Sequence, residues 1–167
     1  MFLWLRPFRY LAQALTVEAT PRRMACGFAL GMVVGLVPKG NLIAVALMLL
    51  LCTLRVNLGI GLLAALAFSW LGMLADPLSH VIGARLLAWG PLVPVWTAMY
   101  DLPVLPWSGY NNTVVLGSLV VGLAAAVPVA RLTEPVFARY SPRVAARLQK
   151  FRIVRLLWGA EWGARLG

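Results

Sequence analysis

The sequence predicts an all-α polytopic membrane protein with two spanning helices, two broken or re-entrant helical hairpins, and amphipathic interfacial helices at both ends. Of its 167 residues, 62% are hydrophobic and 12% are charged, whereas only about half of a soluble domain is apolar. Gly, Pro and Asn interrupt the apolar runs at spacings too short for full crossings. Basic residues flank the apolar region on both sides, as they flank membrane spans.

Residues 1–19 are expected to form an amphipathic helix in the membrane interface. Trp4, Phe8, Leu11 and Leu15 recur at helical spacing, and arginine, glutamine and threonine side chains occupy the opposite face. A helix with this division of faces lies in the plane of the interface rather than across the bilayer.

The membrane domain is assigned to residues 20–131 and begins at Thr20-Pro21, a hydroxyl N-cap followed by proline at the first helical position. It contains five apolar segments: Met24–Val37, Asn41–Leu54, Asn57–Ala75, Leu78–Met99 and Thr113–Ala130. The third and fifth are long enough to span. The first two have about 14 residues each, short of the ~20 that a crossing needs, and are separated by a break at Pro38, Gly40 and Asn41.

The distribution of charge predicts a bacterial inner-membrane protein with both termini in the cytoplasm. Arginine and lysine cluster before the first apolar segment and after the last, so the number of crossings should be even. The stretch from residue 99 to 112 contains neither, and is framed by Trp96, Tyr100, Trp107 and Tyr110. We therefore expect a periplasmic connection there, with an interfacial aromatic belt.

Two arrangements satisfy this even number. In the first, Met24–Leu54 is a hairpin that enters from the cytoplasm, and Leu78–Tyr110 is a second hairpin broken at Gly90-Pro91, so that the halves form an inverted repeat. In the second, Met24–Leu54 is one kinked crossing and the protein has four spans. The first is favoured, because about 31 helical residues would reach ~46 Å against a hydrocarbon core near 30 Å.

Residues 132–167 are predicted to form a basic amphipathic segment that begins at Ser141-Pro142, again a serine cap followed by proline. Such a helix would dock on anionic lipid headgroups. The alternative is a solvated basic tail without specificity.

Gly27, Gly31 and Gly35 lie on one helical face. Because glycine has no side chain, another helix can approach this face until the backbones nearly touch, which is how many helices associate within lipid. The expected partner is the returning arm, Leu42–Leu54.

Three cations are candidate ligands for a lipid phosphate: Lys39, Arg55 and Arg85. A lysine at a hairpin tip within the membrane is costly unless it faces water, an acidic partner or a phosphate. The alternative for Lys39 is that the tip reaches the far interface and the side chain extends into it.

Asp76 and His80 are one helical turn apart and form a candidate proton relay. Asp76-Pro77 can equally be a helix start, with the carboxylate as N-cap. The sequence contains no nucleophile elbow, phosphate-binding glycine loop or zinc-protease motif. We expect no enzymatic activity, no cofactor and no metal.

The pattern P-x3-A-x-G-x-A-x-G-x3-G-x2-P from Pro21 to Pro38, followed by Arg55-x-Asn57 and Asp76-Pro77, resembles the DUF2062-like family of small uncharacterised bacterial inner-membrane proteins. The resemblance covers about Thr20 to Arg131 and implies a membrane location without a reaction. Many members have Asn-Pro in place of Asp76-Pro77. The paired hairpins are also similar in topology to DedA-type membrane proteins linked to lipid movement.

These observations favour a non-enzymatic subunit of an envelope complex, which handles phospholipid and passes it to a periplasmic partner. The net charge of +10 is assigned to contact with anionic headgroups rather than nucleic acid. The expected partners are phospholipid, the membrane, and a larger periplasmic-facing protein or a second copy of the chain. The alternatives are a proton-coupled small-solute transporter or exporter, and a purely structural assembly factor.

Overall fold

The computed structural model describes residues 20–148, with side chains up to residue 140, and within this range the chain is helical without strands. The predicted interfacial helix over residues 1–19 and the end of the basic segment, residues 149–167, lie outside the described residues. The elements are α2 (Pro21–Leu36), α3 (Leu42–Thr53), α4 (Leu58–Leu87), the 3-10 helix η2 (Gly90–Leu92), α5 (Val93–Tyr100), the 3-10 helix η3 (Leu105–Ser108) and α6 (Thr113–Leu148).

Short polar side chains set the starts of the first three helices. Thr20 Oγ1 accepts a hydrogen bond from the amide three residues on, at 3.4 Å. Asn41 and Asn57 cap α3 and α4 through their Oδ1 atoms, which accept from the amides of Ala44 at 2.8 Å and Ile60 at 2.9 Å. Each cap satisfies an amide that the helix itself leaves without a partner. The predicted break between α2 and α3 is confirmed, because α2 ends at Leu36 and α3 begins at Leu42.

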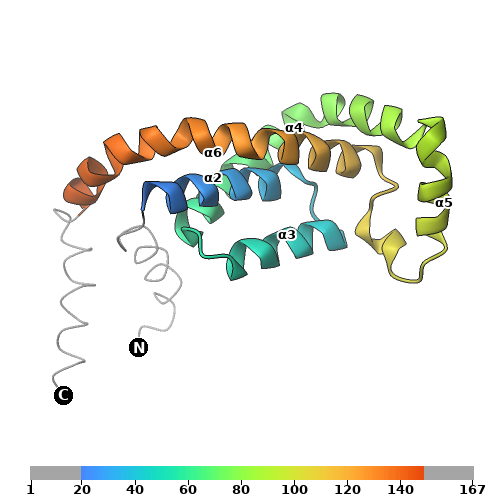
Figure 1. The fold of residues 1–167 in the computed structure, drawn as a ribbon, viewed down its shortest axis with the longest axis horizontal. Helices are drawn as coiled ribbons and strands as arrows, with labels where there is room; N and C mark the ends of the chain where they lie inside the picture. The colour runs from blue at the N-terminus through green and yellow to red at the C-terminus, as the bar shows by residue number, and fades with distance from the viewer. Residues whose placement is uncertain (1–19, 149–167) are drawn as a thin grey trace, which may run out of the picture.

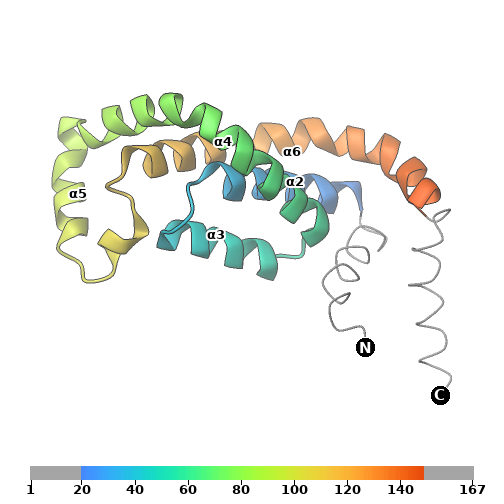
Figure 2. The same ribbon diagram turned by 180° about the vertical axis from the view of Figure 1, so that it is seen from behind.

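Helices α2, α4 and α6 pack against one another, and α3 lies along α2 (Figure 1). α2 and α4 run in the same direction, because Gly27 lies beside Asn57 and Gly31 beside Gly61. α3 connects α2 to α4 and runs in the opposite direction to both. α6 is also antiparallel to α2 and α4, as the reverse view in Figure 2 shows.

The glycine face of α2 lies against the backbone of α4. A Cβ added to Gly31 would be 2.0 Å from the carbonyl oxygen of Gly61, and one added to Gly27 would be 2.5 Å from that of Asn57. For Gly35 the distance to a carbonyl oxygen of α4 would be 2.7 Å. The prediction that this face packs against the returning arm is wrong, because a face without side chains admits any helix and does not specify which one.

A second close contact joins α4 to α6. A Cβ on Gly83 would lie 1.8 Å from the carbonyl oxygen of Thr113, and one on Gly117 would lie 1.8 Å from that of Ser79. The two glycines therefore let the main chains of α4 and α6 touch where the chain has returned from α5.

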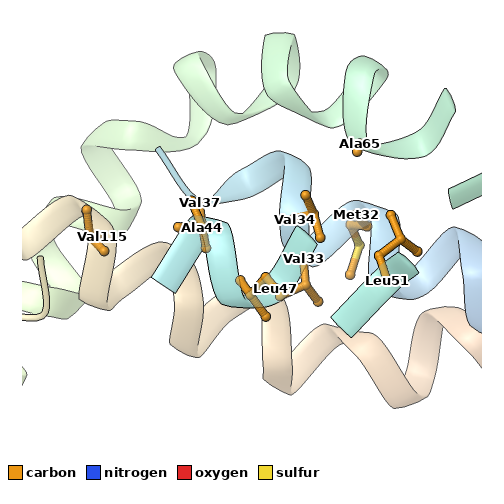
Figure 3. Packing of buried hydrophobic residues seen from close by; sticks show 9 residues of the cluster. All are labelled: Met32, Val33, Val34, Val37, Ala44, Leu47, Leu51, Ala65 and Val115. Carbon is orange, nitrogen blue, oxygen red and sulfur yellow. The ribbon is translucent and has the colours of Figure 1, made fainter. Parts of the chain in front are cut away.

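The hydrophobic core gathers around α2 (Figure 3). Val33, Val34 and Val37 are fully buried, and α3 contributes Leu47 and Leu51. The remaining members of this core cluster come from all four long helices: Met32, Ala44, Ala65 and Val115. α3 is thus attached through side chains, whereas α4 and α6 are attached through backbone contacts.

α4 is one helix of 30 residues that continues through Asp76-Pro77. The interpretation of Asp76 as an N-cap is therefore wrong. Pro77 has no amide hydrogen for the preceding turn, and a helix tolerates this by bending. α4 is visibly curved in Figures 1 and 2.

The second predicted hairpin differs from the first. The chain does break at the predicted Gly90-Pro91, after α4 ends at Leu87. Its first arm, however, is the end of α4 itself, and its second arm, α5, has 8 residues against 12 in α3. Within the described residues, the two halves are thus unequal in construction.

α6 has 36 residues and continues without interruption across the predicted domain boundary at residues 131–132. Ser141-Pro142 lies inside it, so the predicted helix start there is wrong. Proline at regular intervals along α6, at Pro128, Pro135 and Pro142, removes single hydrogen bonds without ending the helix.

α4 and α6 are long and apolar enough to cross a membrane by length and composition, over Leu58–Leu87 and Thr113–Tyr140. Only 33% and 28% of their most apolar windows are buried inside the protein. About half of their large hydrophobic side chains in the described residues are exposed; the most exposed are Leu74, Leu132, Trp70, Met73 and Leu66.

Candidate functional site

The turn between α2 and α3 is held by the side chain of Lys39. Its ammonium donates hydrogen bonds to the carbonyl oxygens of Val34, of Gly35 at 3.2 Å and of Val37 at 2.8 Å. These are carbonyls that the end of α2 leaves without amide partners, so Lys39 caps the helix and places its charge at the negative helix end. Partial burial lowers the pKa of Lys39 from its ordinary value of 10.5.

Beside this turn lies a cavity of about 670 Å³, which we call the turn cavity. It is lined by the α2–α3 turn, the start of α3, and the connection that precedes α6: Pro38, Lys39, Gly40, Asn41, Leu42, Val45, Pro106, Trp107, Gly109, Asn111, Asn112 and Val115. The turn and the connection therefore lie at the same level of the molecule. Gly40 has φ +93°, a conformation that other residues rarely adopt.

The polar side chains of the turn cavity are largely engaged in local structure. Asn41 donates from Nδ2 to the carbonyl of Pro38 at 2.7 Å while its Oδ1 caps α3. Asn112 Oδ1 accepts from the amides of Val114 at 2.9 Å and Val115 at 3.2 Å, at the start of α6. Together with the capping role of Lys39, these bonds build the ends of three helices.

A second cavity, of about 500 Å³, lies near the start of α2, and we call it the basic-end cavity. α2, the α3–α4 connection and α6 form its walls: Arg22, Ala25, Cys26, Ala29, Leu30, Leu54, Val56, Ala126, Val127, Ala130, Arg131 and Glu134. Its lining is mainly apolar, with two arginines and one glutamate.

Five arginines gather around this cavity at one end of the molecule, which we call the basic end: Arg22, Arg23, Arg55, Arg131 and Arg139. The amide of Asn57 donates to the carbonyl of Arg23 at 3.1 Å, which brings the start of α2 beside the start of α4. α6 arrives at the same end, since the rings of Phe28 and Phe137 lie 6.0 Å apart. All five arginines are exposed.

The structure does not bring together the three predicted phosphate ligands. Lys39 and Arg55 lie at opposite ends of α3, whose 12 residues correspond to about 18 Å. Arg85 is in the last turn of α4, past the contact with α6. Lys39 lines the turn cavity, whereas neither Arg55 nor Arg85 lines either cavity.

Asp76 and His80 lie one turn apart on α4, as their spacing predicts. His80 is exposed, and its Nδ1 is 2.7 Å from the hydroxyl of Thr113 at the start of α6. Asp76 is half-buried. Among the described residues there is no group of three His, Cys, Asp or Glu side chains that could hold a metal, and Cys26 and Cys52 are free thiols.

The aromatic residues before α6 differ in their surroundings. Tyr110 is only 4% exposed, stacks on Trp96 with ring centroids 6.0 Å apart, and donates its hydroxyl to the Trp96 carbonyl at 2.9 Å. Trp96 in turn donates to the carbonyl of Leu86 at 3.1 Å. Tyr100 and Trp107 are exposed. Of the four aromatic residues predicted to form an interfacial belt, only these two present most of the ring to the surroundings.

The sequence interpretation missed Arg22, Arg131 and Glu134 as residues of one cavity. The arginines were assigned only to the flanking charge. The sequence did contain a signal for this cavity, because two alanines one helical turn apart lie near each arginine. Ala25 and Ala29 follow Arg22, and Ala126 and Ala130 precede Arg131. Small side chains next to a charge leave room for a ligand, but only the fold brings the two helices together.

The chain is similar to an uncharacterised protein of Treponema pallidum (strain Nichols), with 26% identity over 130 residues. The alignment covers 78% of this chain and 80% of that protein. No family model matches the chain. No solved structure matches it.

Proposed function

We propose that the protein is an integral subunit of the bacterial inner membrane that takes phospholipid from the bilayer between α3 and α6 and passes it to a periplasmic partner. α4 and α6 cross the membrane in this proposal. The basic end lies at the cytoplasmic face, and the connection between α5 and α6 lies towards the periplasm.

The exposure of α4 and α6 supports membrane insertion. A core helix of a soluble protein would bury most of its apolar surface, whereas only 33% and 28% of the two apolar windows are buried here. Transfer of such surface to hydrocarbon is favourable by roughly 25 cal/mol per Å². The gathering of arginines at one end supports the orientation, because basic residues favour the cytoplasmic side.

The observation that carries the lipid-handling proposal is the placement of the two cavities. Each is bordered by α6 and by one end of α3, the turn cavity by Leu42 and Val115 and the basic-end cavity by Leu54 and Ala126. They therefore open at opposite ends of the same side of the molecule. Side chains of the core cluster lie between the two cavities. A lipid could pass from one cavity to the other only if α3 moved away from α2.

α3 is suited to such a movement. It is held to the other helices by side chains such as Leu47 and Leu51, whereas α2, α4 and α6 touch through their backbones. Its opposite face is apolar and exposed, including Leu49, so that face would remain in lipid throughout.

A partner is proposed because little of the described chain projects beyond the helices. The connection before α6 exposes Val104 and Trp107, at 58% and 74%. Trp107 lines the turn cavity, where a partner could receive lipid.

Photo-crosslinking tests this proposal. The full chain is reconstituted into vesicles that contain a phospholipid with a diazirine on its acyl chain, irradiated, and the labelled peptides are mapped. We expect labelling at Val45 and Val127 beside the two cavities to exceed that at Leu66 and Leu74, which face outwards from α4 and report contact with bulk lipid. Equal labelling at all four positions would contradict lipid uptake between α3 and α6.

A further inference from the structure

We propose that the basic-end cavity binds the headgroup of an aminophospholipid, with Arg22 and Arg131 on its phosphate and Glu134 on its amine. One acyl chain lies along Ala126 and Ala130 of α6. This inference rests on the proposed function, because it requires the basic end to lie at the level of the headgroups.

The two arginines approach the cavity from different helices, Arg22 from the first turn of α2 and Arg131 from α6. Both are exposed, and within the described part of the chain neither guanidinium is engaged by another side chain. Guanidinium groups form paired, charge-assisted hydrogen bonds with phosphate oxygens. Two of them at one cavity can hold a single phosphate from both sides.

The interior of the cavity suits hydrocarbon. Ala126 and Ala130 of α6 are partly exposed along it, whereas Ala25 and Ala29 of α2 lie almost fully buried at its base. The volume of about 500 Å³ is within the range of ~300–1,000 Å³ that small-molecule sites occupy. A free phosphate ion would leave most of this space empty, whereas a glycerol backbone and the first part of an acyl chain would fill it.

Glu134 distinguishes between headgroups. It lies one turn after Arg131 on α6 and lines the same cavity. A carboxylate weakens the binding of a simple anion, but it complements a headgroup in which an amine follows the phosphate. The arrangement of two cations and one anion therefore matches a zwitterionic headgroup better than a purely anionic one.

The test measures lipid retained by the purified full chain in detergent, by native mass spectrometry, after addition of phosphatidylethanolamine or phosphatidylglycerol. Arg22→Gln and Arg131→Gln should each weaken retention of both lipids by about tenfold, as expected for loss of a charge-assisted hydrogen bond. Arg139→Gln is the matched control, because Arg139 is exposed at the basic end but does not line the cavity. It should change retention by less than about twofold.

Glu134→Gln tests the assignment of the amine. We expect it to remove the preference for phosphatidylethanolamine over phosphatidylglycerol while total retention persists. An equal change for both lipids would overturn this assignment, since Glu134 would then only screen the arginines. Equal losses for the two cavity variants and the Arg139 control would overturn the site.

Competition separates a lipid from a free phosphate. Millimolar inorganic phosphate should leave the bound lipid in place, and displacement of the lipid at that concentration would overturn the lipid assignment.

The proposed function can fail independently of this lipid site. If the diazirine labelling between α3 and α6 is absent while the arginine variants behave as expected, the cavity binds a resident lipid and uptake is contradicted. Melting temperatures of all variants in detergent verify that each is folded.

Discussion

At the level of single residues, the contact between Gly31 and Gly61 leaves no room for even one methyl group. We expect Gly31→Ala to destabilise the folded protein by roughly 1–3 kcal/mol, the usual cost of overpacking, because the new Cβ would lie 2.0 Å from a carbonyl oxygen. Gly90→Ala is the control, since nothing lies within 4 Å of a Cβ there. Thermal unfolding in detergent measures both. Similar losses for the two variants would contradict the backbone contact.

Lys39 allows a second prediction at this scale. Lys39→Met keeps the aliphatic stem and removes the donors to three carbonyls at the end of α2. We expect a loss of about 1 kcal/mol in unfolding free energy, a modest value because the side chain is only partly buried. Arg85→Met, at an exposed position in the last turn of α4, should have a smaller effect. If Lys39 instead serves as a phosphate ligand, lipid labelling at the turn cavity would fall while stability stayed unchanged.

Among the helices, the packing of α4 on α6 predicts an order of sensitivity along α6. A Cβ at Gly117 would lie 1.8 Å from the backbone of Ser79, whereas one at Gly122 would lie 3.3 Å from the side chain of Val33, which can adjust. Gly117→Ala should therefore lower the melting temperature clearly, and Gly122→Ala only slightly. The reverse order would place the close approach elsewhere along α6.

How far the sequence predicts these helices depends on the signal that marks each end. Asn41 and Asn57 are N-caps whose side chains satisfy a specific amide, and both predicted starts are correct. A cap residue followed by proline starts α2 at Thr20-Pro21, but Asp76-Pro77 and Ser141-Pro142 show the same pattern inside helices. A cap followed by proline permits a helix to begin without requiring it. Around Asp76-Pro77, an apolar neighbourhood that favours continued backbone hydrogen bonding overrides it.

The candidate site could be predicted only in part for a related reason. The break at Pro38 is local in sequence and appears as predicted, and Lys39 beside it lines the turn cavity. The pairing of Arg22 with Arg131 depends on α6 returning antiparallel to α2, which no local pattern encodes. The alanines on each helix indicate a potential hollow but not its second wall.

For the molecule as a whole, the proposed orientation predicts which positions share a side of the membrane. Single cysteines at Arg55, Val104 and Lys39 are introduced after Cys26 and Cys52 are replaced by alanine, and an impermeant thiol reagent is applied to intact spheroplasts. We expect Arg55→Cys to be unreactive and Val104→Cys to react. Lys39→Cys should react with the reagent as Val104→Cys does, because the turn and the connection line one cavity. Reaction of Arg55→Cys from outside would reverse the proposed orientation.

The parallel arrangement of α2 and α4 constrains how the protein is made. The backbone partner of α2 is α4, which is synthesised only after the whole of α3. A nascent chain that ends near residue 57 therefore leaves the glycine face of α2 open to any nearby helix. Ribosome-bound or prematurely terminated chains would thus be the species most exposed to wrong helix pairing and to proteolysis. Completion of α4 covers the glycine face of α2 in the growing chain.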